Sequence, residues 1–334
     1  MGHFVSTSTS FLEQEAVAVG DFQKDGVHKP RDLTTTLCYY DEAADKAKVE
    51  EPIDPKRERP KVWYPETPRK QVITTIKDIT GRESSFTLDK HGFQLSWQQN
   101  TIITSSEDLL NEDKIKNVYY PKMQKWLQEV YALTRVPKCG ANADPQTNRT
   151  GAPRVLVYHH GVRTSLQEGV KFVPGNWAKG GPRTAAPPVY SVHLDQSGWE
   201  SHNIVRRHLP KEADVLLQKR VVIVNAWRPI KTVYRDPFGV ASASTVPSSD
   251  LVRRPYKSFD ETRETLAVRP NPKHEWFFKY QQTPEEVLLF KGYDTHGDAR
   301  ACPHSAFVDE EEKGKEVRES IEIRALLIYE EWEG

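Results

Sequence analysis

The stretch Ser191–Ser197 has the sequence Ser-Val-His-Leu-Asp-Gln-Ser and ends an apolar run that begins at Val189. Alternate residues of a strand point to the same face, so His193 and Asp195 are expected to converge on one point at the end of this strand. In many iron proteins, two histidines and one carboxylate hold Fe(II) on one face and leave other coordination positions open. His193 and Asp195 supply one histidine and the carboxylate of such a set. The stretch therefore predicts a β-sheet protein with a metal site at a strand end.

Beyond Gly140 the chain alternates short apolar runs with turns at glycine and proline, a spacing that is typical of a β-sandwich or barrel. We find no internal repeat, which disfavours a propeller or a solenoid. The sequence predicts a mainly β protein with flanking helices and a jelly-roll core of the cupin type. The clearest strands are Val155–Tyr158, Val189–Leu194, Val221–Trp227, Trp276–Tyr280, Val287–Phe290 and Ile321–Tyr329.

The whole chain, residues 1–334, is expected to form a single domain with three regions. Residues 1–70 are rich in charge and proline and are interpreted as an N-terminal arm. Residues 71–150 are expected to supply flanking strands and helices, and residues 151–330 the jelly-roll core with the metal site. Within the first two regions, the apolar runs Leu37–Tyr40 and Gln71–Ile76 indicate strands that pair with a later sheet.

One segment before the core has helical periodicity. From Ser105 to about Leu133 the apolar residues recur at intervals of three and four. We expect Ser106 to cap this helix and Pro121 to divide it into two. The preceding segment, Phe86–Phe93, is interpreted as a strand that runs into a turn at Gly92.

The charge balance and the cysteine content indicate the class of binding partner and the cellular location. Basic and acidic residues number 47 each, so no net charge favours nucleic acid or an anionic membrane surface, and we expect a small-molecule partner. The odd number of cysteines, three, does not describe a disulfide framework, which favours a reducing, cytoplasmic location. No apolar run approaches the roughly 18 residues of a membrane span. The oligomeric state has no signal in the sequence.

The histidine-x-aspartate pattern occurs twice, so the pattern alone does not identify the site. The second match, at His296 and Asp298, lies in a turn rather than at a strand end. A third ligand from a neighbouring strand needs intervening chain, and His304 is far from Asp195 but only a few positions from Asp298. We therefore predict a metal site formed by His193, Asp195 and His304.

A strand with one polar face follows the last of these residues. Arg318, Ser320, Glu322 and Arg324 alternate with an apolar set on the other face, namely Ile321, Ile323, Ala325 and Leu327. A planar guanidinium with a hydroxyl two positions away suits one carboxylate of 2-oxoglutarate. We predict Arg318 and Ser320 as this anchor, with Arg324 as the alternative.

Further polar and aromatic residues are candidates for the pocket. Asn225 lies in the otherwise apolar strand Val221–Trp227 and needs hydrogen-bond partners, either the backbone or an oxygen of substrate or 2-oxoglutarate. Tyr158 and Arg163 lie on the strand before the metal strand. We expect the substrate pocket to include Tyr158, Arg163, Trp227, Phe238 and Arg324.

Several segments resemble one protein family in the same order, from about Phe86 to Tyr329. The family is that of fungal gibberellin desaturases, which includes the hydroxylase/desaturase of the aspergillic acid pathway and proteins labelled cephem methoxylase-like. The segments that carry the resemblance are Val192–Ser197, Asn225–Pro229, Arg235–Pro237, Glu286–Lys291, Pro303–Phe307 and Arg318–Arg324.

This resemblance implies a double-stranded β-helix and an oxygenase of secondary metabolism that depends on Fe(II), 2-oxoglutarate and O2. Such an enzyme hydroxylates, desaturates or cyclises a small molecule and releases succinate and CO2. His193, Asp195 and His304 match the family's iron ligands, and Arg318 matches its 2-oxoglutarate anchor. The sequence departs from the family in Arg235–Ser244, where Phe238-Gly239 replaces an expected Leu-Ala, so the resemblance does not carry substrate identity.

Two alternatives remain open from the residues. The same three ligands in a hydrolase hold Zn²⁺ and activate water, which leaves Arg318 unexplained. In a jelly-roll binding protein without catalysis, the histidines are structural. Dependence on oxygen distinguishes the oxygenase from both.

Overall fold

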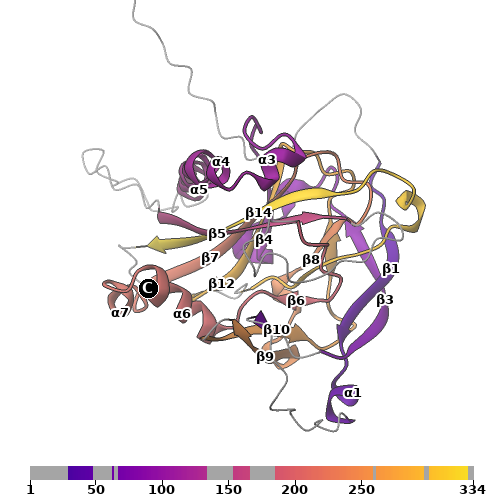
Figure 1. Cartoon of the computed structure of the whole chain (residues 1–334). Coiled ribbons are helices and arrows are strands. Elements are labelled where there is room, and N and C mark those ends of the chain that lie inside the picture. Colours follow the sequence, from indigo (N-terminus) through magenta and orange to yellow (C-terminus); the bar gives the residue numbers. More distant parts are fainter. Residues whose placement is uncertain are drawn as a thin grey trace, which may run out of the picture.

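A computed structural model of the chain describes residues 29–47, 62–63, 67–133, 153–165, 185–258, 261–296 and 301–329. Within these ranges the chain forms two β-sheets that lie one above the other in Figure 1. Aromatic contacts join them, because Phe238 of one sheet stacks on Trp227 of the other at 4.9 Å between ring centroids. The mainly β fold with two packed sheets confirms the predicted class.

The larger sheet carries the candidate metal ligands. Its strands are almost all antiparallel neighbours, with a parallel pair between β3 and β11. In spatial order they are β1 (Leu33–Tyr40), β3 (Arg69–Asp78), β11 (Trp276–Phe278), β8 (Phe238–Ala241), β13 (His304–Ala306), β6 (His193–Leu194), β10 (Glu261–Val268), β9 (Leu251–Ser258) and β2 (Val62–Trp63).

The smaller sheet is antiparallel throughout its described pairs. Its middle strand β7 is buried along its whole length, as its apolar sequence predicted. A register shift where β5 pairs with β14 leaves Tyr158 without an opposite residue. In spatial order its strands are β4 (Phe93–Trp97), β12 (Glu286–Asp294), β7 (Arg220–Pro229), β14 (Glu319–Tyr329) and β5 (Arg154–Thr164).

The two faces of β14 have different surroundings. Its apolar residues, including the fully buried Ile321 and Ile323, pack in one cluster with residues of helix α5 (Tyr120–Leu133), which lies on that side of the sheet in Figure 1. Burial of each such side chain contributes about 1.5–3 kcal/mol. The polar face of β14 consequently points to the interior between the two sheets, where the site lies.

Two helical predictions need correction. The helical segment is α3 (Ser106–Leu110), α4 (Glu112–Lys114), a π-helical turn at Ile115–Tyr119 and α5. Ser105, not Ser106, caps α3. Pro121 does not divide the helix, because it lies in the first turn of α5 directly after the wider π-helical turn, where its ring and missing N–H are tolerated.

The interpretation of Phe86–Phe93 as a strand was wrong, because local capping forms a helix there. Thr87 accepts a hydrogen bond from the backbone of Lys90, and α2 (Leu88–His91) follows. Gly92 ends this helix with a φ of 79°, a left-handed conformation that favours glycine, and β4 begins at the next residue.

The other predicted strands agree with the structure, although the strand before the metal stretch is shorter than expected. Of Val189–Leu194, only β6 is a strand, and Ser191 forms an isolated bridge with Cys38. In the described ranges, the remaining helical elements are α1 (Glu42–Ala47), α6 (Gly198–His208), α7 (Ala213–Leu216) and 3-10 turns at Glu83–Ser85, Ala243–Thr245, Ser248–Asp250 and Glu310–Glu312. Among the described residues, no helix has the length and apolar character needed to cross a membrane.

Candidate metal and cosubstrate site

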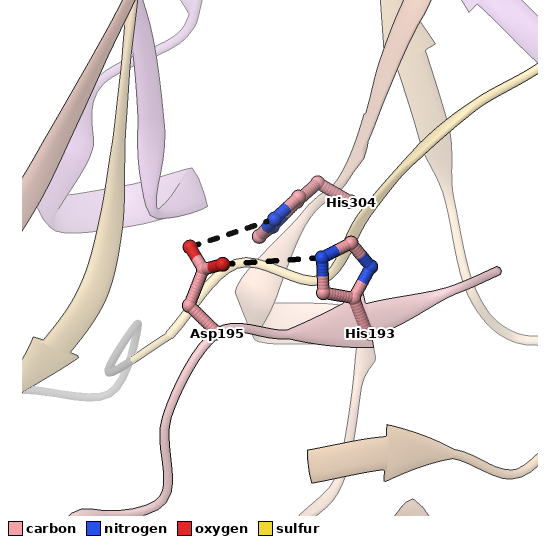
Figure 2. A group of neighbouring side chains, drawn as sticks. All are labelled: His193, Asp195 and His304. Atoms are coloured by element: carbon pink, nitrogen blue, oxygen red, sulfur yellow. Dashed lines mark ion pairs between the residues drawn. The ribbon is translucent and has the colours of Figure 1, made fainter. Parts of the chain in front are cut away.

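The side chains of His193, Asp195 and His304 point toward one another, as Figure 2 shows. His193 and His304 lie directly opposite each other on β6 and β13, and Asp195 follows β6 by one residue. The distance from Asp195 Oδ1 to His193 Nε2 is 3.9 Å, and that from Oδ2 to His304 Nε2 is 3.7 Å. One ligand atom from each of the three residues lies within 4.8 Å of the other two, a group that could hold one metal ion.

Backbone carbonyls fix the tautomer of both histidines. His193 Nδ1 lies 2.7 Å from the carbonyl oxygen of Ser191, and His304 Nδ1 lies 3.1 Å from that of Cys302. A carbonyl only accepts, so each Nδ1 carries the hydrogen and donates it. Each Nε2 therefore keeps a free lone pair, which is the form of imidazole that binds a metal.

Burial shifts the titration of these groups. The pKa of His193 is lowered to about 4, first by burial and then by the neighbouring His304. Burial also lowers the pKa of His304. For Asp195, burial opposes ionisation, but the Arg324 guanidinium and the two imidazoles hold the pKa of its carboxyl below the usual range. The site therefore presents two neutral imidazoles and one carboxylate near neutral pH.

We expect the metal-free protein to lose stability as the pH falls from about 6.5 towards 4. In this interval His193 takes up a proton in the unfolded chain, where its pKa is near 6.5, but not in the folded chain, where it is about 4. Thermal unfolding in a chelator at several pH values measures this loss. His193→Gln removes the titrating group, so its unfolding temperature should depend less on pH; an equal dependence in both proteins contradicts the expectation.

A second set of side chains surrounds the Asp195 carboxylate. Asn225 Nδ2 donates to Asp195 Oδ2 at 2.7 Å, and Arg324 Nη2 donates to Oδ1 at 2.5 Å. Glu322 Oε1 accepts from Arg324 Nε at 2.8 Å. Burial opposes the charge of Arg324, but Asp195 and Glu322 raise the pKa of its guanidinium above the usual range. Arg324 and Asn225 thus both hydrogen-bond to Asp195, and their predicted contacts with substrate and cosubstrate stay predictions.

Arg318 and Ser320 have a different environment. Both side chains are almost completely buried, at 2% and 0% exposure. Arg318 Nη1 donates to the backbone carbonyl of Asp236, but its Nε and Ser320 Oγ have no hydrogen-bond partner among the described residues. Burial lowers the pKa of Arg318 to about 10, so it stays protonated at neutral pH. A buried cation and hydroxyl with unused donors fit a carboxylate ligand.

Aromatic rings connect this pair to the metal ligands. The Arg318 guanidinium lies 5.4 Å from the centre of the Trp227 ring, and Trp227 stacks on Phe238. Phe238 in turn stacks on His304 at 5.5 Å, and Phe290 lies 4.8 Å from the same imidazole. Trp227 and Phe238 therefore connect His304 to Arg318 by ring contacts, and their role as substrate-pocket residues stays a prediction.

The remaining candidates lie at the edges of this interior. Arg163 is opposite Ser320 in the sheet and donates to the carbonyl of Pro187 at 3.2 Å. Tyr158 packs against His208 at 5.0 Å between rings, and its hydroxyl has no hydrogen-bond partner among the described residues. His296 contacts Thr295, whereas Asp298 lies outside the described residues.

Sequence reasoning missed Glu322 and Phe290 as parts of the site. Glu322 shares the polar face of β14, so the alternation of that strand carries a signal for it. Phe290 belongs to an apolar run buried on both faces and has no such signal. Its place beside His304 depends on how the two sheets pack.

Comparison with known proteins places the chain in a family. Residues 37–137 and 144–328 match the sequence model of a family described as oxidoreductase/YMDC permease-like domain. Hydroxylase/desaturase efuI of Hormonema carpetanum is 35% identical over 274 residues, which are 77% of this chain and 84% of that protein. The chain belongs to the family of fungal hydroxylase/desaturases and alpha-ketoglutarate-dependent dioxygenases.

Other members and structures agree with this assignment. The alpha-ketoglutarate-dependent dioxygenase phiK from a fungal species is 30% identical over 264 residues, 77% of this chain and 84% of that protein. A solved variant of the iron and alpha-ketoglutarate-dependent endoperoxidase NvfI has the same fold, with a TM-score of 0.69 at 17% identity, and covers 89% of this chain and 97% of its own.

As a member of this hydroxylase/desaturase family, the protein is an oxidoreductase, and its relatives phiK and tstK are named as alpha-ketoglutarate-dependent dioxygenases. The resemblance noted in the sequence is thereby confirmed. Membership favours the oxygenase over the zinc hydrolase and the non-catalytic binding protein. The donor set of two imidazoles and a carboxylate fits Fe(II), and the unused donors of Arg318 and Ser320 fit 2-oxoglutarate.

Proposed function

We propose that this hydroxylase/desaturase relative binds Fe(II) through His193, Asp195 and His304 and anchors 2-oxoglutarate through Arg318 and Ser320. The observation that carries the proposal is the three-residue ligand group, together with the buried Arg318 Nε and Ser320 Oγ, which have no hydrogen-bond partner in the described part of the chain. The proposed reaction hydroxylates, desaturates or cyclises a small-molecule metabolite and releases succinate and CO2.

Each side chain has a distinct part in this proposal. The two imidazoles and the Asp195 carboxylate hold the ion, and the Arg318 guanidinium with the Ser320 hydroxyl donates to the distal carboxylate of the cosubstrate. With O2, the bound ion and cosubstrate supply an oxidant for an unactivated carbon. Trp227 and Phe238 exclude water from the space beside His304 and orient the organic substrate by apolar contact.

The aromatic residues beside His304 indicate the class of substrate. An aromatic wall formed by Trp227, Phe238 and Phe290 favours an apolar or partly aromatic metabolite as substrate. Arg163 and Tyr158 are proposed to contact its polar groups at the edge of the pocket.

We propose a cytoplasmic location and neither a nucleic-acid nor a membrane partner, in line with the balanced charge and the cysteine content.

The test has two readouts. Anaerobic addition of Fe(II) and then 2-oxoglutarate is expected to produce a weak visible charge-transfer band, because the cosubstrate chelates the ion. Admission of oxygen is expected to release succinate. His193→Ala should lack the band. A wild-type protein without a band contradicts the iron and 2-oxoglutarate site, and turnover of substrate without oxygen indicates hydrolysis instead.

A further inference from the structure

Each oxygen of the Asp195 carboxylate faces one histidine and one hydrogen-bond donor. Oδ1 lies 3.9 Å from His193 Nε2 and accepts from Arg324 at 2.5 Å. Oδ2 lies 3.7 Å from His304 Nε2 and accepts from Asn225 at 2.7 Å. The carboxylate is therefore held at both oxygens by residues other than the proposed metal ligands, and its rotation is restricted from both sides.

Glu322 closes these contacts into a ring. Its Oε1 accepts from Arg324 Nε at 2.8 Å and from Asn225 Nδ2 at 3.2 Å. The amide of Asn225 thus directs its two hydrogens to two different carboxylates. Arg324 and Asn225 are also directly opposite each other on β14 and β7. Sheet register therefore places Arg324 and Asn225 side by side, with Glu322 two positions from Arg324 on the same face of β14.

The charges in the ring are arranged around one cation. Arg324 lies between the carboxylates of Asp195 and Glu322, and all three side chains are largely shielded from solvent. A guanidinium that paired with Asp195 alone would withdraw electron density from a metal ligand and repel a cation. Glu322 divides the charge of Arg324 between two partners, so Asp195 stays an effective donor to a metal.

We propose that Arg324 is a positioning residue that orients Asp195 for metal binding, and that Glu322 offsets its charge. This inference rests on the proposed binding of metal by His193, Asp195 and His304. It removes Arg324 from the candidates for the 2-oxoglutarate anchor and from direct contact with substrate. It also gives Asn225 the role of the second donor to the same carboxylate.

Cobalt(II) titration followed by its visible bands tests this proposal without turnover. Arg324→Met keeps much of the side-chain volume but removes the donors, and it is expected to lower metal affinity about 10- to 100-fold, as loss of a group that orients a ligand does. At saturating metal, its affinity for 2-oxoglutarate should be unchanged. Arg324→Lys keeps the charge and should recover part of the lost metal affinity; a lysine variant no better than methionine overturns the proposal.

Arg324→Met leaves Glu322 buried without its cation, so a second variant guards against misfolding. The double variant Arg324→Met/Glu322→Gln removes both charges, and thermal unfolding of the metal-free form checks its fold. We expect it to bind cobalt as weakly as Arg324→Met, because Asp195 has lost the same donor. Glu322→Gln alone keeps the shape but not the charge, and it should weaken cobalt binding severalfold.

Wild-type cobalt affinity in the folded double variant overturns the inference. A loss of 2-oxoglutarate affinity without loss of metal affinity in Arg324→Met also overturns it, because Arg324 is then the anchor. His304→Ala distinguishes a failure of the proposed metal site from a failure of the positioning role of Arg324. If it binds cobalt like wild type, the proposed metal site itself is wrong; if it loses cobalt while Arg324→Met does not, only the positioning role is wrong.

Discussion

Replacement of Arg318 by methionine is expected to raise the dissociation constant for 2-oxoglutarate by roughly 10- to 100-fold. A hydrogen bond to a charged group contributes about 1.5–3 kcal/mol. Methionine removes the buried guanidinium and with it this contribution to the binding free energy of the cosubstrate carboxylate. Metal affinity should change little, because Arg318 contacts the carbonyl of Asp236 and the Trp227 ring rather than a ligand. Titration of 2-oxoglutarate into the iron-loaded protein without oxygen measures the effect.

Arg253→Met is the matched control for this experiment. The Arg253 side chain is 68% exposed and pairs with Glu264 on the larger sheet, so the same substitution there should leave the cosubstrate affinity unchanged. A normal 2-oxoglutarate affinity in Arg318→Met excludes Arg318 as the anchor. A weakened affinity for both cosubstrate and metal indicates a general disturbance of the site.

Replacement of His304 by alanine is expected to abolish metal binding and oxygen-dependent release of succinate. The substitution removes one of three protein ligands, and the remaining pair has no third donor in the group found in the described residues. Metal content after dialysis and cobalt titration measure the loss.

His296→Ala provides the control, since His296 belongs to the other histidine-x-aspartate match in the sequence. Its imidazole contacts Thr295 and is not part of the ligand group. This variant should bind metal like wild type. If His296→Ala loses metal and His304→Ala retains it, the metal site includes His296 rather than His304, and the proposed ligand set is wrong.

Strand alternation explains why the grouping of the candidate ligands was predictable. His193 and Asp195 are two positions apart, and the pairing of β6 with β13 brings His304 beside them. The jelly-roll class followed from the short apolar runs. The roles of these residues in binding iron stay a prediction, as does the division of the chain into an arm, a flanking region and a core.

Alternation along β14 was informative only in part. It predicted that Arg318, Ser320 and Arg324 share one face, but not which of them reaches Asp195. That depends on the register of β14 against β7, which puts Arg324 opposite Asn225 and therefore near the ligand. Register between strands is a long-range property, and no local pattern reports it.

The short helix before Gly92 was missed for the opposite reason, because local capping overrode an apolar pattern.

The ring around Asp195 also has a mechanical consequence. Asp195 belongs to the chain segment of the larger sheet, but Asn225 and Arg324, which hold its carboxylate, belong to the smaller one. Any breathing motion that separates the two sheets must therefore pull the carboxylate away from the histidines. Backbone amides of β6 and β7 should consequently exchange with solvent together, and a metal that holds the carboxylate should slow both at once.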